Sequence, residues 1–102
     1  MSERELNLAE IPFEGGGVHL RYERYLAKDG QRWVRHGLFR SYHPSGALAS
    51  EGNYLHGVET GVWRDYHANG ELAAEGRYEA GEKAGAWKYW NESGVLEAEE
   101  NH

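Results

Sequence analysis

The sequence predicts an all-β protein: an antiparallel β-hairpin repeat solenoid, with 24-residue repeats forming one elongated, curved single sheet. Three observations predict this fold. One pattern of glycine and aromatic residues recurs at a fixed step along the chain, as at Gly37, Gly61 and Gly85. Each copy contains a glycine preceded by Asn or Ser, which is typical of a hairpin turn. The 102-residue chain is also rich in glycine (14) and in aromatic residues (4 Trp, 7 Tyr and 2 Phe), whereas helical bundles avoid the former and disordered chains the latter.

The repeat divides the chain into segments. Residues 1–16 show no repeat and are expected to be an N-terminal cap or tail. A degenerate copy follows at 17–36, and it is shortened because the interval from Gly17 to Gly37 is less than one full step. The repeat domain is therefore expected over 17–102, with matched copies at 37–60, 61–84 and 85–102.

Nine columns keep the 24-residue step, which makes chance a poor explanation. The best-matched columns are Gly37, Gly61 and Gly85; Phe39, Trp63 and Trp87; Tyr42, Tyr66 and Trp90; Gly46, Gly70 and Gly94; Leu48, Leu72 and Leu96; and Glu51, Glu75 and Glu99.

Each copy is expected to form one hairpin. The dipeptide at 69–70, Asn-Gly, favours a two-residue type I′ turn, which would place Trp63 opposite Gly76 and Arg64 opposite Glu75. A type I turn followed by a glycine bulge is the alternative, and it would shift the pairing by one residue. Under the first turn, a cation faces a carboxylate in every copy: Arg40 and Glu51, Arg64 and Glu75, Lys88 and Glu99.

The same pairing predicts two different faces, because side chains alternate along a strand. The first face is expected to be the core, with Trp63, Leu72, Ala74, Gly76 and Tyr78. The second is amphipathic, with Tyr66 and Val62 beside the Arg64–Glu75 rung. Single hairpins are not stable alone, so three or four are expected to stack into one sheet. The acidic run at 97–100 would protect an exposed edge strand.

Composition excludes several classes of function. The chain has no cysteine and no apolar run near the ~20 residues of a membrane helix. Its charged first ten residues do not resemble a signal peptide, so a soluble, cytoplasmic protein is expected. A net charge of −6 argues against nucleic acid or an anionic membrane as a direct partner, and it is compatible with a basic protein.

No catalytic constellation is found, so we expect no enzyme, no cofactor and no metal site. The repeated Glu column indicates structural ion pairs rather than one unequal pair of catalytic carboxylates. The six histidines lack metal-ligand spacing, and His43 and His67 occupy equivalent positions beside turns. The glycine run at 15–17 lacks the Lys-Ser/Thr of a phosphate-binding loop.

The unit resembles the bacterial variant of the MORN repeat. The residues that carry the resemblance are Gly61, Trp63, Tyr66, Gly70, Leu72, Glu75, Gly76, Tyr78, Gly81 and Gly85. Short bacterial proteins of this kind include the YwqK-type antitoxins, which are immunity partners of toxins. The resemblance implies a β-hairpin solenoid that binds a cognate toxin, expected to be basic, in the bacterial cytoplasm. The degenerate first copy and the N-terminal segment depart from the pattern.

The leading functional prediction is thus an antitoxin that neutralises a toxin by occlusion. A scaffold or a homo-oligomeric assembly module joined edge to edge is the alternative. The columns Phe39, Trp63 and Trp87 are interpreted as core, and the amphipathic face as the partner surface. The candidate partner-binding residues are Tyr42, Tyr66, Trp90, Arg40, Arg64 and Lys88, together with Tyr89 and Trp33, which break the repeat.

Overall fold

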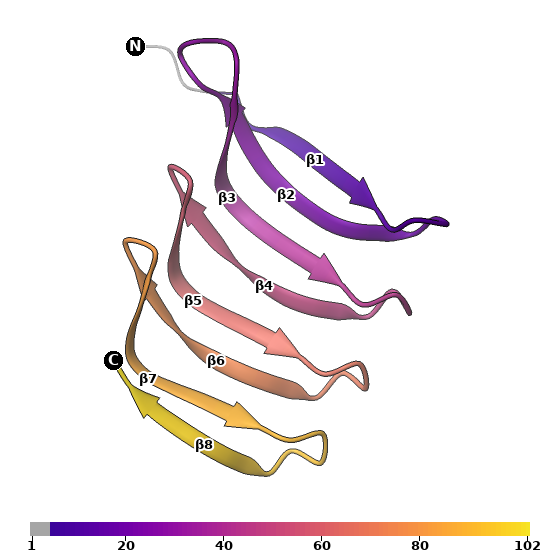
Figure 1. Ribbon diagram of the computed structural model, residues 1–102, viewed down its shortest axis with the longest axis vertical. Coiled ribbons are helices and arrows are strands. Elements are labelled where there is room, and N and C mark those ends of the chain that lie inside the picture. Colours follow the sequence, from indigo (N-terminus) through magenta and orange to yellow (C-terminus); the bar gives the residue numbers. More distant parts are fainter. Residues whose placement is uncertain (1–4) are drawn as a thin grey trace.

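The computed structural model describes residues 5–102, in which eight antiparallel strands form one open sheet in chain order (Figure 1). The predicted all-β repeat fold is confirmed. The strands are β1 (Asn7–Pro12), β2 (Val18–Leu26), β3 (Trp33–Tyr42), β4 (Leu48–Leu55), β5 (Val58–Tyr66), β6 (Leu72–Glu79), β7 (Glu82–Trp90) and β8 (Leu96–Asn101).

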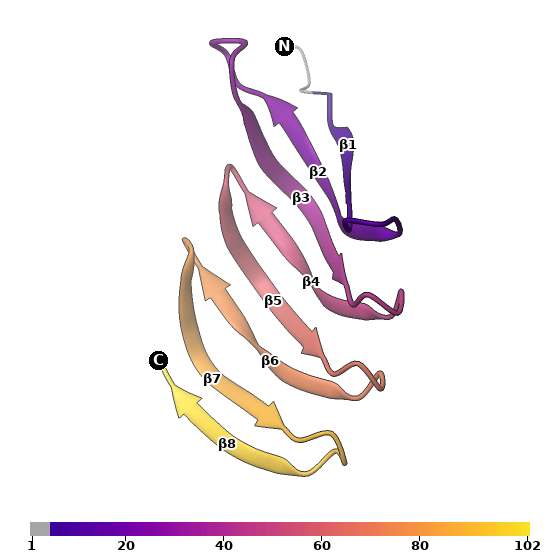
Figure 2. The same ribbon diagram turned by 45° about the vertical axis from the view of Figure 1, so that its right-hand side comes forward.

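The sheet is a single bowed layer. Its extents are 47 × 37 × 18 Å, and its strands curve along their length (Figure 2). β1 belongs to the same sheet, because it pairs with β2 from Asn7 to Pro12. Residues 7–12 of the expected N-terminal cap or tail are therefore the first strand, while residues 1–4 lie outside the described residues.

The turn within each repeat differs from the preferred prediction. Gly70 N–H donates to His67 O (2.9 Å), and His67 N–H donates to Glu71 O (2.8 Å). Gly70 has a φ of +90°, but Asn69 is not in the left-handed region, so a type I′ turn is wrong here. The turn is instead the alternative, a type I turn completed by a left-handed glycine. The Asn69 side chain favours it by accepting the Glu71 N–H (3.0 Å).

The predicted pairing still holds, because a bulge compensates for the turn. Trp63 faces Gly76 and Arg64 faces Glu75, as expected. The register shifts by one residue between Asp65 and Tyr66, which leaves Ala73 without a direct opposite. Leu72 consequently pairs with Tyr66, so its predicted place on the Trp63 face is wrong.

Two-residue type I′ turns do occur, at the opposite ends of the strands from the turn at Gly70. His56 and Gly57 have φ values of +46° and +91°, and Ala80 and Gly81 have +50° and +84°. Each turn connects one repeat to the next, with Leu55 opposite Val58 in the first case. A positive φ at His56 is strained for a residue with a Cβ, and the following glycine makes the tight turn possible.

The core is a row of flat aromatic rings on one face of the sheet. Phe39, Trp63 and Trp87 are buried, as predicted, and Leu20, Tyr22, Tyr54, Tyr78 and Tyr89 pack against them. The Trp63 ring covers Gly52, and the Trp87 ring covers Gly76. A Cβ at either glycine would overlap the indole. Each tryptophan therefore rests on the glycine of the preceding hairpin.

Hydrogen bonds and edge contacts fix these rings. Trp63 Nε1 donates to Asn53 O (3.1 Å), and Trp87 Nε1 donates to Arg77 O (3.0 Å). Tyr78 meets both indoles edge-on, with ring centroids 5.9 Å from Trp63 and 5.1 Å from Trp87. Edge-to-face pairs contribute about 0.5–1.5 kcal/mol beyond simple burial. Aromatic stacking thus links each hairpin to its neighbours.

Histidines provide a second link between neighbouring repeats. His43 Nε2 donates to Tyr66 O (2.8 Å), and His67 Nε2 donates to Trp90 O (2.7 Å). The predicted turn-flanking role of these residues is confirmed. The equivalent residue in the third copy is Asn91, whose Oδ1 accepts N–H groups within its own turn.

The glycine beneath the ring gives a stability prediction. Gly76→Ala should lower the free energy of unfolding by at least about 2 kcal/mol, because the new Cβ displaces the Trp87 indole. The measurement is urea denaturation followed by tryptophan fluorescence. In a Trp87→Phe background the same substitution should cost clearly less, because the smaller ring leaves room. An equal cost in both backgrounds would contradict the stacking account.

Candidate interaction surface

One charged side chain from each strand forms a continuous row across the sheet. These residues alternate in sequence with the buried aromatic positions, so they lie on the opposite face. Each is the direct cross-strand partner of the next. The charge row consists of Glu10, Arg21, Arg40, Glu51, Arg64, Glu75, Lys88 and Glu99.

Ion pairs connect members of the charge row. Arg64 Nε lies 2.6 Å from Glu75 Oε2, and this hydrogen bond raises the pKa of Arg64 above its usual value. Arg40 Nε lies 3.5 Å from Glu51 Oε2. Their side chains are partly exposed, so each pair contributes only about 0.2–1 kcal/mol to stability. These ion pairs therefore contribute little to holding the fold together.

The predicted aromatic residues lie at the end of this face. Tyr42, Tyr66 and Trp90 are the last residues of β3, β5 and β7, and all three are half-buried. The Tyr66 hydroxyl donates to Glu51 Oε1 (3.3 Å), and burial together with the Glu51 charge raises the pKa of Tyr66. Six predicted residues, the three rings with Arg40, Arg64 and Lys88, therefore share one surface.

Tyr89 lies elsewhere, on the aromatic face. Its ring stacks on Trp87 with centroids 6.5 Å apart. Its hydroxyl donates to Glu100 Oε1 (2.7 Å) and accepts from Lys83 Nζ (3.0 Å). The bond from Tyr89 is the main reason that the pKa of Glu100 is lowered. Tyr89 is thus separated from the other predicted residues by the thickness of the sheet.

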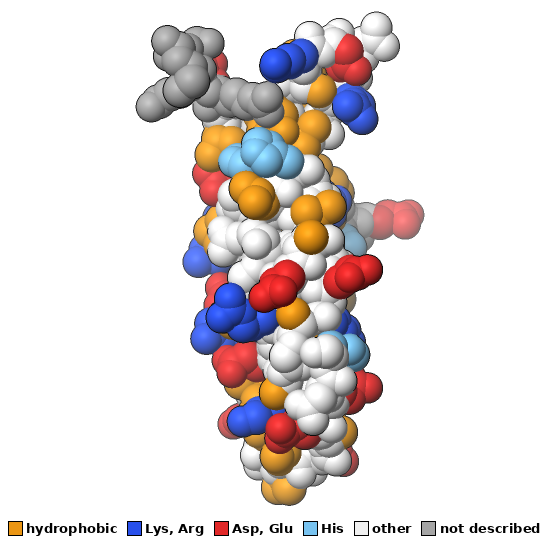
Figure 3. Space-filling view, turned by 90° about the vertical axis from the view of Figure 1, so that its left-hand side faces the viewer, with side chains coloured by type: hydrophobic (Ala, Val, Ile, Leu, Met, Phe, Trp, Pro, Cys, Tyr) orange, Lys and Arg blue, Asp and Glu red, His pale blue; other side chains and the backbone are white. Residues whose placement is uncertain are grey.

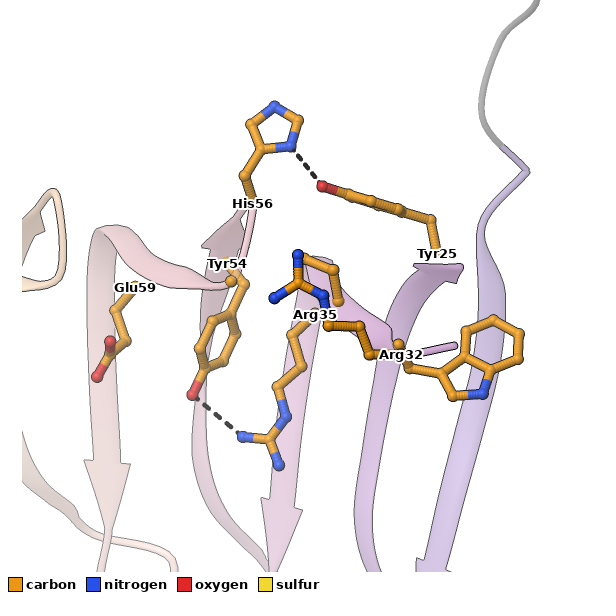
Figure 4. Close-up of a pocket in the computed structure, with 9 residues that line it drawn as sticks. Tyr25, Arg32, Arg35, Tyr54, His56 and Glu59 are labelled. Carbon is orange, nitrogen blue, oxygen red and sulfur yellow. Dashed lines mark hydrogen bonds between the residues drawn. The ribbon is translucent and has the colours of Figure 1, made fainter. Parts of the chain in front are cut away.

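Trp33 lies at the start of β3, beside an open cavity of about 640 Å³ (Figure 4). Arg24 stacks on its ring, with Cζ 3.9 Å from the centroid. Side-chain hydrogen bonds join some of the lining residues: Tyr25 Oη lies 2.9 Å from His56 Nδ1, and Arg35 Nη1 donates to Tyr54 Oη (3.4 Å). His56 breaks the repeat, because the equivalent residue in the next copy is Ala80, whereas Tyr54 keeps it, with Tyr78 as its equivalent.

Arg35 closes the end of the aromatic row. Its Cζ lies 4.7 Å from the Tyr22 ring centroid and 5.3 Å from that of Phe39. Lys83 is equivalent by two repeat steps, and its Nζ lies 4.8 Å from the Trp87 centroid. Cation–π contacts of this kind stabilise the rings and shield them from a partner.

Sequence reasoning missed Glu10 and Arg21, which extend the charge row to β1 and β2. Glu10 Oε1 lies 2.7 Å from Arg21 Nη2. Neither residue keeps the 24-residue step, because the two form the same cross-strand pair as Arg40 and Glu51 but lie 30 residues earlier.

The expected shortening of the first copy is therefore wrong: the connection between β2 and β3, residues 27–32, is longer than the two-residue turns that join the later hairpins. The segment Gly17 to Tyr22 resembles the start of a repeat, but the structure places most of it in the second strand of the first hairpin, with Arg21 at the position that Glu51 holds in the next hairpin.

The charge row is electrically balanced, with four carboxylates and four cations. Acidic and basic side chains are also interspersed on the side of the molecule that Figure 3 shows. Among residues 5–102, no cluster of three or more His, Cys, Asp or Glu side chains could hold a metal ion. No helix long and apolar enough to span a membrane is found in this described part of the chain.

Comparison with known families identifies the repeat. The model of the MORN repeat variant matches residues 35–56, 59–80 and 83–102, more than half of the chain. The chain therefore belongs to the MORN-repeat family. Each match covers one hairpin, β3–β4, β5–β6 or β7–β8, and successive matches begin one repeat step apart. No curated protein and no solved structure matched the chain.

The charge row can be tested for its contribution to stability. In a double-mutant cycle, Arg64→Ala and Glu75→Ala should show a coupling of about 0.5–1 kcal/mol, read from urea unfolding curves. About 1 M NaCl should reduce it, because salt screens exposed charges.

The matched control for this cycle is the pair of Asp29 and Arg32, whose atoms lie 3.6 Å apart near a loop and are more exposed. Its coupling should be near zero. A coupling between Arg64 and Glu75 that salt leaves unchanged would contradict their interpretation as a partly exposed ion pair.

Proposed function

We propose that this chain is a protein-binding module that acts by covering part of a partner's surface, without catalysis. The observation that carries the proposal is the charge row, which presents eight partly exposed charged groups over the full length of the sheet. Exposed apolar residues lie beside it, including Leu8, Leu38 and Val62. Arginine and tyrosine are enriched in protein interfaces, and the exposed apolar residues beside them are suited to the interface core.

Cavities along the charge-row face support this proposal. One of about 300 Å³ is lined by Val62, Arg64, Glu75, Arg77 and Lys88, among others. Another of about 340 Å³ lies beside Arg21 and Arg40. The aromatic face is a weaker candidate, because its rings are largely buried against one another and are covered by cations at both ends.

The more specific proposal is an antitoxin of the bacterial cytoplasm that binds a toxin and blocks its active surface. It is supported by the resemblance to YwqK-type antitoxins and by an interface long enough to cover a partner. The alternative is a scaffold or a homo-oligomeric assembly module, and membership of the MORN-repeat family fits this alternative. Because the charge row is balanced, the net charge of −6 does not make the partner basic at this surface.

The test measures binding to the protein encoded beside this gene. The two proteins are purified, and their Kd is measured by calorimetry. Arg64→Ala should weaken binding by about tenfold or more, as expected for an arginine in an interface. Arg32→Ala is the matched control, exposed and outside the charge row, and it should bind like wild type.

Each result has a defined meaning. Loss of affinity in the Arg64 variant alone supports the charge-row interface. Equal affinity of wild type and the Arg64 variant contradicts it, as does failure of the neighbouring protein to bind. Rescue of growth on co-expression with that protein distinguishes an antitoxin from a scaffold, which would bind without rescue.

A further inference from the structure

The alternation of the charge row fails at one position. Of its seven cross-strand pairings, six bring opposite charges together within the described strands. The seventh places Arg21 of β2 directly opposite Arg40 of β3. Like charges directly opposite one another destabilise a sheet. This pairing therefore calls for a compensating anion.

Each of these two arginines faces a carboxylate on one neighbouring strand and the other arginine on the opposite neighbouring strand. Arg21 pairs with Glu10 on β1, and Arg40 pairs with Glu51 on β4. Glu51 is shared, since it also faces Arg64 and accepts the Tyr66 hydroxyl. By contrast, Arg64 has a carboxylate partner on both neighbouring strands.

An apolar groove adjoins the two arginines. The cavity of about 340 Å³ contains Arg21 and Arg40 together with Leu6, Leu8 and Leu38, all three of which are exposed. The cavity also contains one carboxylate, Glu23, but its Oε1 accepts the Leu38 N–H (2.9 Å). The groove thus combines two guanidinium groups with an apolar wall.

We propose that Arg21 and Arg40 together bind a carboxylate side chain of the protein partner, with an apolar neighbour of that residue in the leucine groove. Guanidinium groups bind carboxylates through paired, planar hydrogen bonds. The incoming carboxylate gives each arginine the two-sided compensation that Arg64 already has. The leucines favour a protein segment over a free anion, because an isolated phosphate would leave them uncovered.

This inference rests on the proposed function and adds the chemistry of the partner. The contacting segment contains Asp or Glu beside a residue such as Leu, so it is acidic at this point. The expectation of a basic toxin does not extend to the part of the partner that meets β2 and β3.

The test is an NMR titration of the full chain with a blocked Leu-Glu-Leu peptide. We expect saturable shifts of the side-chain N–H signals of Arg21 and Arg40. Arg21→Gln and Arg40→Gln should each weaken peptide binding about tenfold, the loss expected when a charged hydrogen-bond partner is removed. Arg32→Gln is the matched control, an exposed arginine outside the charge row, and it should bind the peptide normally.

Two further probes identify the source of the anion. Leu-Gln-Leu should not bind, because it lacks the carboxylate. Inorganic phosphate should bind more weakly than Leu-Glu-Leu. Equal binding of the Gln peptide, tighter binding of phosphate or no response at Arg21 and Arg40 would each overturn the proposal.

The two proposals can fail separately. Calorimetry with the neighbouring protein is repeated for Arg21→Gln and Arg40→Gln. If these variants bind it like wild type while Arg64→Ala is weakened, the carboxylate site is wrong and the charge-row interface stands. If all of them bind it like wild type, the charge-row interface is wrong as well. If the wild-type chain itself does not bind the neighbouring protein, the proposed function is wrong.

Discussion

The fold depends on one repeated contact, an indole ring lying flat on a glycine of the preceding hairpin. A single-layer sheet has no second layer to cover its core, so large flat rings must lie on the backbone itself. Gly52 and Gly76 make this possible, since a Cβ at either would overlap the ring. In the first and last hairpins the glycine position is held by other residues. Tyr22 comes directly after Arg21, and Glu100 comes directly after Glu99, as Gly52 and Gly76 come after their charge-row residues. Tyr22 is paired with Phe39 rather than with a tryptophan, in keeping with the reduced space.

Placing the core on one face leaves the other face available for recognition. Because side chains alternate, the aromatic row fixes the residues on either side of each ring on the opposite face. The charge row is the result. Strand pairing sets the positions of its charged groups, and the ion pairs between them contribute little to this arrangement. Residues on this face can therefore be substituted without loss of the core, and the Arg21–Arg40 pairing is the position where the pattern of the charge row departs from simple alternation.

The 24-residue step was sufficient to predict the sheet, its core rings and the rungs such as Arg64 opposite Glu75. The turn at Gly70 was not predictable in the same way, because the turn type and the bulge at Ala73 change the register by equal and opposite amounts. Arg21 was missed because the long connection between β2 and β3 takes the first hairpin out of the 24-residue step, and its partner is defined only by strand pairing. Tyr89 was predicted as a partner-binding residue because it breaks the repeat, and that signal gives no indication of its face. Its stacking on Trp87 places it on the aromatic face.

Native-state hydrogen exchange, resolved residue by residue, tests the central claim most directly. Indoles connect β4 with β5 and β6 with β7, and Tyr78 joins the two pairs. We predict that the amides of these four strands open together, at the highest free energy in the molecule. Those of β8, where Glu100 stands in the glycine position, should exchange at a lower free energy. Protection of β8 equal to that of β5 would contradict the account.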